Sequence, residues 1–255
     1  MTRASVALAR RALRNSFRRP QFLAPLVVFP SLFLAVNVGG LHGTTALPGF
    51  EHVNGFLDFQ LAAAITQSVL LGGVTAGIAT ALEIEGGFFD RLIASPIPRV
   101  SLILGRLIAT AVLAAGQACW FLAVGLIFGA EIVAGVPGAL LVVAIASCAG
   151  IGFAAIGMLL AFRAKNASIV QGIFPLVFVI LFVSSAFFPR GLLRPPADWL
   201  ADYNPLSYIA EGMRDPIISS ISAGAVVDGF AAAVGVTAVF TLLAVAALRG
   251  RLREA

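Results

Sequence analysis

Few side chains in this sequence have the types and the spacing that enzymatic chemistry requires. A phosphate-binding loop needs a lysine directly after a glycine, but the single lysine, Lys165, follows Ala164. The zinc pattern His-Glu-x-x-His and the nucleophile pattern Gly-x-Ser-x-Gly are both absent. Cys119 and Cys148 lie in separate apolar runs, where we expect them to pack as small apolar residues. The sequence therefore predicts no catalytic, cofactor-binding or metal-binding site in this chain.

The island of charged side chains over residues 83–99 stands out because long apolar runs flank it on both sides. It holds three acidic residues and two arginines. Its apolar residues recur at spacings of three and four, which predicts a short amphipathic helix lying at the membrane face. The apolar side would carry Phe88, Phe89, Leu92 and Ile93, and the polar side Glu85, Asp90 and Arg91. A solvated loop anchored by its positive charges is the simpler alternative.

The elements that must position this island are long apolar segments. Apolar residues form 60% of the 255-residue chain and charged residues 11%, whereas a soluble domain has about 25% charged residues. We expect an all-α polytopic membrane protein that forms one transmembrane domain over residues 1–255. Asp58 and Arg106 lie near the ends of two apolar segments, where we expect them to reach water. The six predicted spanning helices are residues 21–40, 58–82, 100–128, 137–161, 168–188 and 226–248.

The basic residues set the expected orientation in the membrane. With a cytosolic N-terminus, the cytosolic segments hold 14 of the 17 basic residues, and the C-terminus is cytosolic as well. Six arginines lie within residues 1–19, which we expect to form an amphipathic helix at the interface of an anionic leaflet. A disordered basic tail is the alternative. Leu8 falls outside the apolar face of this helix, which consists of Val6, Ala9, Leu13 and Phe17.

The segment between the fifth and sixth predicted spans is rich in proline and aromatic residues. Two short helices fit residues 189–216, one starting near Pro196 and one near Pro205. Neither is long enough to cross a bilayer, so a re-entrant pair is one interpretation and a surface loop is the other. Glu211 and Arg214 are three residues apart on one helix face, a spacing that allows an ion pair.

Two stretches of the sequence resemble a known family. Residues 85–99 read acid, glycine, aromatic pair, Asp-Arg-Leu, small residue, Ser-Pro and Pro-Arg, and Gly105 and Arg106 follow. This pattern resembles the loop between the second and third helices of ABC transporter permeases of the ABC-2 class, especially bacterial drug-resistance permeases. Residues 188–214 are also similar to this class, from a Phe-Pro pair through Asn-Pro-Leu to Glu-Gly-Met-Arg. The resemblance implies an N-terminal interfacial helix, six spans, and a re-entrant helical hairpin before the last span.

The resemblance also implies partners. In this family the loop is a cytosolic coupling helix that docks on a separate ATPase subunit, and it corresponds here to residues 84–98. The implied machine has two ATPase subunits, which bind ATP and Mg, and two permease subunits, identical or homologous. The family's transport pathway lies between the two permeases. We expect membrane lipid as a further partner and no contact with nucleic acid.

The candidate residues fall into three groups. The ATPase-coupling group is Glu85, Phe88, Phe89, Asp90, Arg91 and Leu92. The substrate-pathway group is Gln60, Thr66, Gln67 and Thr75 on the second span and Phe174, Phe178 and Phe182 on the fifth. For the three phenylalanines, packing in the core or against lipid is the alternative. The exit-gate group is Trp199, Tyr203, Tyr208, Glu211 and Arg214. Gly73 and Gly77 would let a neighbouring helix approach the second span closely.

The sequence therefore predicts the membrane subunit of an ATP-driven exporter in a bacterial cytoplasmic membrane. Its cargo would be a hydrophobic or amphipathic compound, such as a drug or a lipid-like molecule. Export of a lipid-linked glycan or glycolipid is an alternative, because such permeases share the same plan. Two alternatives come from other classes. An intramembrane enzyme would need the catalytic groups that are missing, and a membrane anchor for a cytosolic partner does not explain the polar second span.

Overall fold

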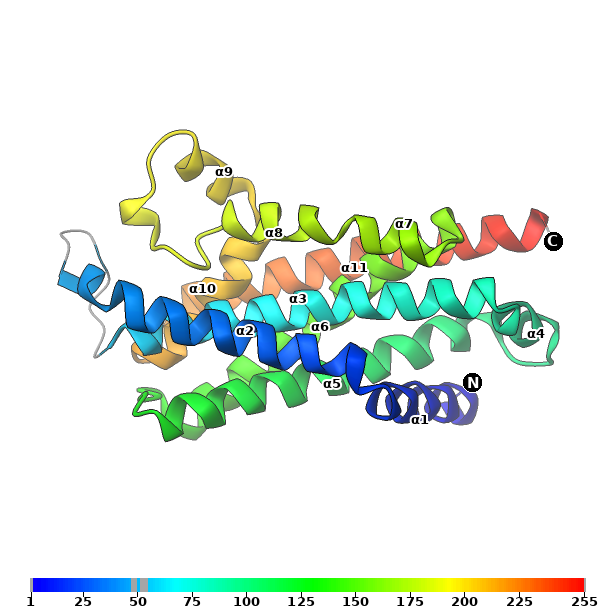
Figure 1. The fold of residues 1–255 in the computed structure, drawn as a ribbon, viewed down its shortest axis with the longest axis horizontal. Helices are drawn as coiled ribbons and strands as arrows, with labels where there is room; N and C mark the ends of the chain where they lie inside the picture. Colours follow the sequence, from blue (N-terminus) through cyan, green and yellow to red (C-terminus); the bar gives the residue numbers. More distant parts are fainter. Residues whose placement is uncertain (1, 47–49, 51–54, 255) are drawn as a thin grey trace.

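The computed structural model describes residues 2–46, 50 and 55–254. This part of the chain is helical and contains no β-strand. Five of the described helices are long and apolar enough to cross a membrane. They are α2 (Pro20–Leu41), α3 (Phe56–Glu85), α5 (Arg99–Ile127), α6 (Gly135–Ala164) and α11 (Ala223–Glu254). Figure 1 shows these helices running along the long axis of the molecule, and the all-helical class predicted from the sequence is confirmed.

The most buried of these helices is α3, which packs closely against α6. A Cβ atom added to Gly77 would lie 2.7 Å from the Cα atom of Gly157, a separation that folded proteins do not tolerate. A Cβ atom added to Gly73 would lie 2.5 Å from the carbonyl carbon of Phe153. Only glycine lets two helix backbones approach this closely. The close approach predicted at Gly73 and Gly77 is therefore confirmed.

The fifth predicted span is not one continuous helix. Residues 168–188 instead contain most of α7 (Ala167–Gly172), all of α8 (Phe174–Phe182) and a stretch of turns. Pro175 explains the break, because proline has no N–H to bond the carbonyl four residues earlier and its ring clashes with that carbonyl. Figure 1 shows the two pieces following one another along one side of the bundle. Neither piece alone has the length of a spanning helix.

The N-terminal helix α1 (Thr2–Arg18) forms as predicted, and it packs Leu8, which the sequence placed outside the apolar face, against protein. A Cβ atom on Gly105 of α5 would lie 2.6 Å from the Cβ atom of Leu8, so Leu8 sits in a groove over that glycine. By contrast, Val6 and Phe17 from the predicted apolar face are 60% and 68% exposed. Ala9 of the predicted face is buried as well, so α1 packs its Leu8 and Ala9 side on protein. Val6 and Phe17 stay open, as expected of an apolar side that faces lipid.

The charged island contains the short helix that was expected. It is α4 (Phe88–Ala94), and residues 84–85 belong to the end of α3. Gly87 enters α4 in the left-handed region with φ of +65°, which glycine adopts without steric cost. The hydroxyl of Ser95 donates to the Leu92 carbonyl and helps to end the helix.

Short helices gather at the other end of the bundle. The 3₁₀ helix η1 (His42–Ala46) follows α2, and the segment between α2 and α3 lies partly outside the described residues. A second 3₁₀ turn, η2 (Arg190–Leu192), precedes α9 (Ala197–Tyr203) and α10 (Pro205–Ile218). Both helices begin beside the prolines expected to start them. The Asn204 side chain accepts from the Leu206 N–H and donates to the Ile180 carbonyl, which fixes the start of α10.

Candidate functional site

The predicted coupling helix α4 turns one of its two phenylalanine side chains into the protomer. Phe89 is 4% exposed, and its ring centroid lies 5.5 Å from that of Phe162 on α6. Leu92 is half-buried and packs against the same apolar cluster. Phe89 was expected to contact an ATPase, but this packing leaves little of its ring for a partner to touch. In this protomer Phe89 therefore holds α4 in place.

The other predicted coupling residues connect α4 to different helices. Phe88 is half-buried under the Arg11 guanidinium of α1, which lies 3.8 Å from the ring centroid. Asp90 is exposed and pairs with Arg251 of α11 at 2.9 Å. Glu85 accepts the Ala167 N–H at 2.9 Å and so holds the first turn of α7.

Arg91 is the exposed basic side chain of this helix. Its neighbours on α4 already contact other helices of the protein, since Phe88 contacts α1, Phe89 contacts α6 and Asp90 contacts α11. Glu85 at the end of α3 holds α7. Arg91 and the exposed part of Asp90 therefore form the polar surface that a cytosolic partner could reach.

A three-residue ion cluster beside α4 was not predicted as a site. One carboxylate oxygen of Glu83 lies 3.1 Å from Arg11 on α1, and the other lies 2.5 Å from Arg106 on α5. Arg106 also donates to the Ala76 carbonyl at 3.2 Å. Its side chain is largely buried, so the expectation that Arg106 simply reaches water was wrong. The sequence held a signal for the pair of Glu83 and Arg106, because these residues lie at facing ends of consecutive apolar runs. It held none for Arg11, which is 72 residues away from Glu83.

Asp58 is the other charged residue that the sequence placed in water. It is 5% exposed, and its carboxylate accepts the backbone N–H of Glu131 at 3.2 Å. The side chain thus ties the start of α3 to the turn between α5 and α6. The expectation failed because helix ends in a bundle are covered by the connections of neighbouring helices.

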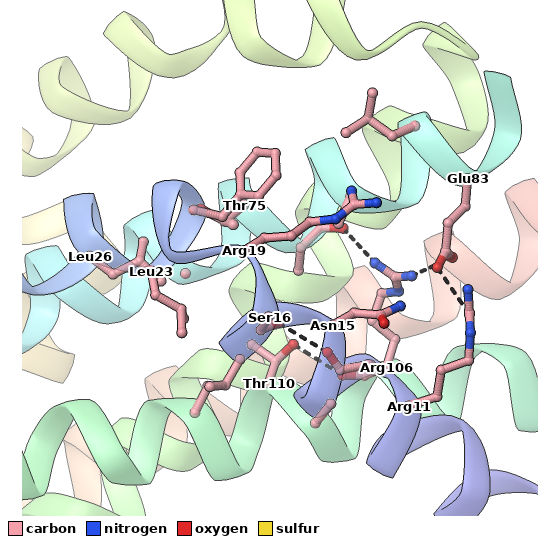
Figure 2. Close-up of a pocket in the computed structure, with 18 of the residues that line it drawn as sticks. Arg11, Asn15, Ser16, Arg19, Leu23, Leu26, Thr75, Glu83, Arg106 and Thr110 are labelled. Carbon is pink, nitrogen blue, oxygen red and sulfur yellow. Dashed lines mark hydrogen bonds and ion pairs between the residues drawn. The ribbon is translucent and has the colours of Figure 1, made fainter. Parts of the chain in front are cut away.

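A cavity of about 470 Å³ opens beside the ion cluster, between α1, α2, α3 and α5. Figure 2 shows charged and polar side chains around one end of it and leucines of α2 toward the other. Of the predicted pathway residues, Thr75 lies on this wall, where its hydroxyl donates to the Leu71 carbonyl. Amphipathic ligands bind in spaces of this size and mixed character.

The other polar residues predicted on this helix are buried inside the protomer. Thr66 donates to the Ala62 carbonyl at 2.8 Å, which satisfies its hydroxyl. Gln67 is 1% exposed, and neither amide atom finds a hydrogen-bond partner among the described residues. The amide oxygen of Gln60 is in the same situation. Buried polar groups are nearly always paired, so these amides are exceptions that call for an explanation.

The phenylalanine stripe of α8 packs on α2. The ring of Phe178 lies 5.5 Å from that of Phe29, and the ring of Phe182 lies 5.9 Å from that of Phe33, both edge to face. Phe174 continues the stripe at 5.2 Å from Phe178. The stripe therefore has a packing role in this protomer.

The outer helices carry a second ion cluster. Glu211 of α10 accepts from Arg190 at 2.6 Å and from the Ser185 hydroxyl at 2.5 Å. Arg190 also pairs with Asp202, and its guanidinium lies 4.7 Å from the ring centroid of Tyr208. Burial alone would lower the pKa of Arg190, but the hydrogen bonds and charges of Glu211 and Tyr208 together outweigh burial, so this pKa is raised and the group stays charged.

The remaining predicted gate residues divide between surface and interior. Trp199 and Tyr203 of α9 are exposed. Arg214 of α10 is buried, and its guanidinium lies 3.7 Å from the ring centroid of Phe59 on α3. It also donates to the carbonyls of Ser185 and Phe59 at 3.1 and 3.3 Å. The arginine thus fastens α10 to the central helix, while α9 remains open at the surface.

The sequence matches the family described as ABC-2 type transporter over residues 3–218, which is most of the chain. This chain belongs to the ABC-2 transporter family. It is also 26% identical over 210 residues to a protein of Porphyra purpurea named "Putative transport permease ycf38". That match covers 82% of this chain and 72% of the relative. Family membership and the apolar helices together identify a multi-pass membrane protein of the permease type.

The matched region of this ABC-2 permease contains both ion clusters, the cavity and α4. The whole of α11 follows the matched region, yet Arg251 on α11 closes the contact with α4. The family implies association with an ABC ATPase. The structural elements at the α4 end are therefore the ones to examine for that association.

Proposed function

We propose that this ABC-2 permease is the membrane subunit of an ATP-driven exporter for a hydrophobic or amphipathic compound. ATP and Mg would bind to two copies of a separate ATPase subunit, and a second permease, identical or homologous, would complete the pathway. The observation that carries the proposal is the connection of α4 to several distant helices. Phe88 meets α1, Phe89 meets α6, and Asp90 meets α11.

Such a helix suits energy coupling because a displacement of it changes contacts with several spans at once. In the proposed mechanism the ATPase touches the exposed polar face with Asp90 and Arg91. Phe89 transfers the movement to α6 as a buried positioning residue. Rigid, close-packed interiors transmit displacement of this kind.

The proposed orientation places α4 and both termini in the cytosol of a bacterial cell and α9 outside. Figure 1 supports it, because the N-terminus, the C-terminus and α4 lie toward the same end of the molecule. The pieces α7 and α8 lead from that end toward α9, so together they would serve as the fifth of six membrane crossings. In this orientation α9 and α10 would form the re-entrant pair near the exit, with Arg190 and Glu211 holding them together.

The proposed route for the cargo follows α3. The amide of Gln67 supports this, since a buried amide without partners is satisfied if a second state of the helix brings it to water or cargo. Cargo passing the outer end would meet the aromatic residues of α9. Export of a lipid-linked glycan or glycolipid remains the second candidate, because an amphipathic cargo of that kind also needs a polar path beside an apolar one.

The direct test of coupling uses charge reversal on the exposed face of α4. The full chain carrying Arg91→Glu is purified by tag from native membranes, and the retained ATPase activity is measured in nanodiscs. We expect activity to fall about tenfold, as loss of a strong interface contact does. Arg194→Glu, an exposed reversal at the opposite end, is the matched control and should retain activity. Equal activity in all three proteins would remove α4 from the coupling contact.

Topology has its own test. Reporter fusions at residue 90 and near either terminus should report from the cytosol, and fusions at residue 194 from outside. A residue 90 fusion reporting from outside would overturn the orientation, whatever the ATPase assay shows.

A further inference from the structure

The cavity beside Glu83 has a surplus of positive charge. Three arginines line it, Arg11, Arg19 and Arg106, against the single carboxylate of Glu83. Two of them share that carboxylate, at 3.1 and 2.5 Å. No carboxylate among the described residues pairs with Arg19, whose side chain reaches the cavity in Figure 2. Two positive charges are thus left without a counter-charge, and the ligand that suits the cavity is an anion.

The opposite end of the cavity is apolar. Leu23 and Leu26 of α2 line it, and Figure 2 shows them pointing into the space away from the guanidinium groups. Ala79 of α3 contributes a small side chain to the wall. A charged end joined to an apolar end matches a molecule with an anionic head and a hydrocarbon tail, whereas a small inorganic anion would fill only one end.

The arginine end continues onto the surface of α1. A second groove shares Arg11 and Asn15 with the cavity and adds Arg10, Arg14 and Arg18. Basic residues spaced along a helix at the membrane surface attract anionic lipid head groups. The groove therefore leads molecules of this charge to the mouth of the cavity.

We infer that the cavity is a binding site for an anionic phospholipid of the leaflet on which α1 lies. The phosphate is held by Arg19 and Arg11, and an acyl chain lies along Leu23 and Leu26. A bound lipid joins α1 to α2, α3 and α5 next to the Glu83 cluster, and so fixes the angle of α1 on the bundle. The inference rests on the proposed membrane placement of α1, and it does not depend on the ATPase or the cargo.

Native mass spectrometry on the delipidated full chain tests this inference. Phosphatidylglycerol and phosphatidylcholine with identical acyl chains are titrated separately, and inorganic phosphate is added as a competitor. We expect one phosphatidylglycerol to bind at least tenfold more tightly than phosphatidylcholine, with no displacement by millimolar phosphate. Arg19→Gln should weaken phosphatidylglycerol binding about tenfold, as loss of one charge-assisted contact does. Arg18→Gln is the comparison, because it removes the same charge one residue away, from the groove that leads to the cavity, and should weaken binding much less than Arg19→Gln.

A second variant examines the apolar end. Ala79→Phe places a ring in the cavity and should weaken phosphatidylglycerol binding while the basic stripe of α1 stays intact. Equal losses for Arg18→Gln and Arg19→Gln would show that the lipid is held by the general charge of α1, and the site would be rejected. Competition by inorganic phosphate at equal affinity would make this a free-anion site and would also overturn the inference. Because the assay uses the chain alone, a failure of ATPase coupling leaves its result unchanged.

Discussion

The two ends of the bundle each hold a glutamate between partners, but the partners are arranged differently. At the α4 end, Glu83 joins Arg11 and Arg106, which lie 72 and 23 residues away on two separate helices. At the α9 end, Glu211 joins Arg190 and Ser185, both in the connecting segment just before α9. The first cluster ties three helices to one another. The second holds the segment before α9 to α10.

This difference predicts different consequences for motion. A shift of α3 at Glu83 must change its contacts with α1 and α5 at the same time. A shift of the outer segment can leave the Glu211 cluster intact, because its members move together. We therefore expect the α4 end to transmit movement from one helix to another, and the α9 end to move as one unit.

The largest effect should come from removing the Glu83 charge. Glu83→Gln leaves the largely buried Arg106 without its carboxylate, which we expect to cost about 3 kcal/mol of stability. Glu211→Gln should cost less, because Arg190 keeps its pairing with Asp202. Thermal unfolding of the purified variants in one detergent would compare the two. A larger loss for Glu211→Gln would reverse the comparison.

A double variant sharpens this measurement. Glu83→Gln combined with Arg106→Gln removes both buried charges, and we expect it to recover part of the lost stability. If the double variant is less stable than Glu83→Gln alone, the pairing does not explain the loss.

The next effect should come from the aromatic residues of the two ends. Phe89→Ala empties a packed site against Phe162, and we expect a loss of about 3 kcal/mol together with weaker ATPase stimulation. Trp199→Ala on α9 should change stability by no more than about 0.5 kcal/mol, because its side chain is 52% exposed. Denaturation midpoints and ATPase rates in nanodiscs would measure both. Phe89→Leu, which keeps an apolar side chain, should retain most of the stability.

A smaller effect is expected between the two ends, at Gln67. Its amide has no hydrogen-bond partner in the described part of the chain, so Gln67→Leu should leave stability unchanged or raise it by about 1 kcal/mol. Transport of amphipathic dyes should nevertheless fall if the amide meets water or cargo in another state. Thr66→Val is the comparison, since that hydroxyl bonds only within its own helix. Unchanged transport of every dye by Gln67→Leu would take this residue out of the route.

The smallest effects should come from the exposed ion pairs of each end. Asp90→Asn breaks the pair with Arg251, and Asp202→Asn breaks the pair with Arg190. Exposed pairs contribute about 0–1 kcal/mol, so neither change should shift the unfolding midpoint much. ATPase coupling should respond to Asp90→Asn and not to Asp202→Asn, because of these two ion pairs it is Asp90–Arg251 that joins α4 to α11. Equal ATPase rates in both variants would show that the α4–α11 contact is not needed.

The local elements could be predicted from the sequence because short-range signals specify them. Gly87 and Ser95 bound α4, and Pro205 begins α10, as their backbone preferences require. Pro175 gave an equally clear signal against a continuous fifth span, but the apolar run around it suggested one helix. Hydropathy measures how apolar a segment is, and it does not register a missing backbone donor.

Contacts between distant segments were beyond such rules. The seat of Leu8 over Gly105 depends on how α1 meets α5, and the burial of Phe89 depends on where α6 ends. A helical wheel shows which residues share a face, yet it cannot say which face meets protein. Five of the six candidate coupling residues lie on the predicted short helix and Glu85 lies at the end of α3, while packing decides which of them are buried and which are exposed.

The glycine contact between α3 and α6 has a mechanical consequence. Where Gly77 and Gly157 touch backbone to backbone, no side chain lies between the helices to rotate or compress. The two helices are therefore expected to move as one rigid body, with α4 attached to one end and α10 held near the other by Arg214. A small tilt of this rigid body at the α4 end would appear as an opposite displacement at the far end, without any helix having to bend.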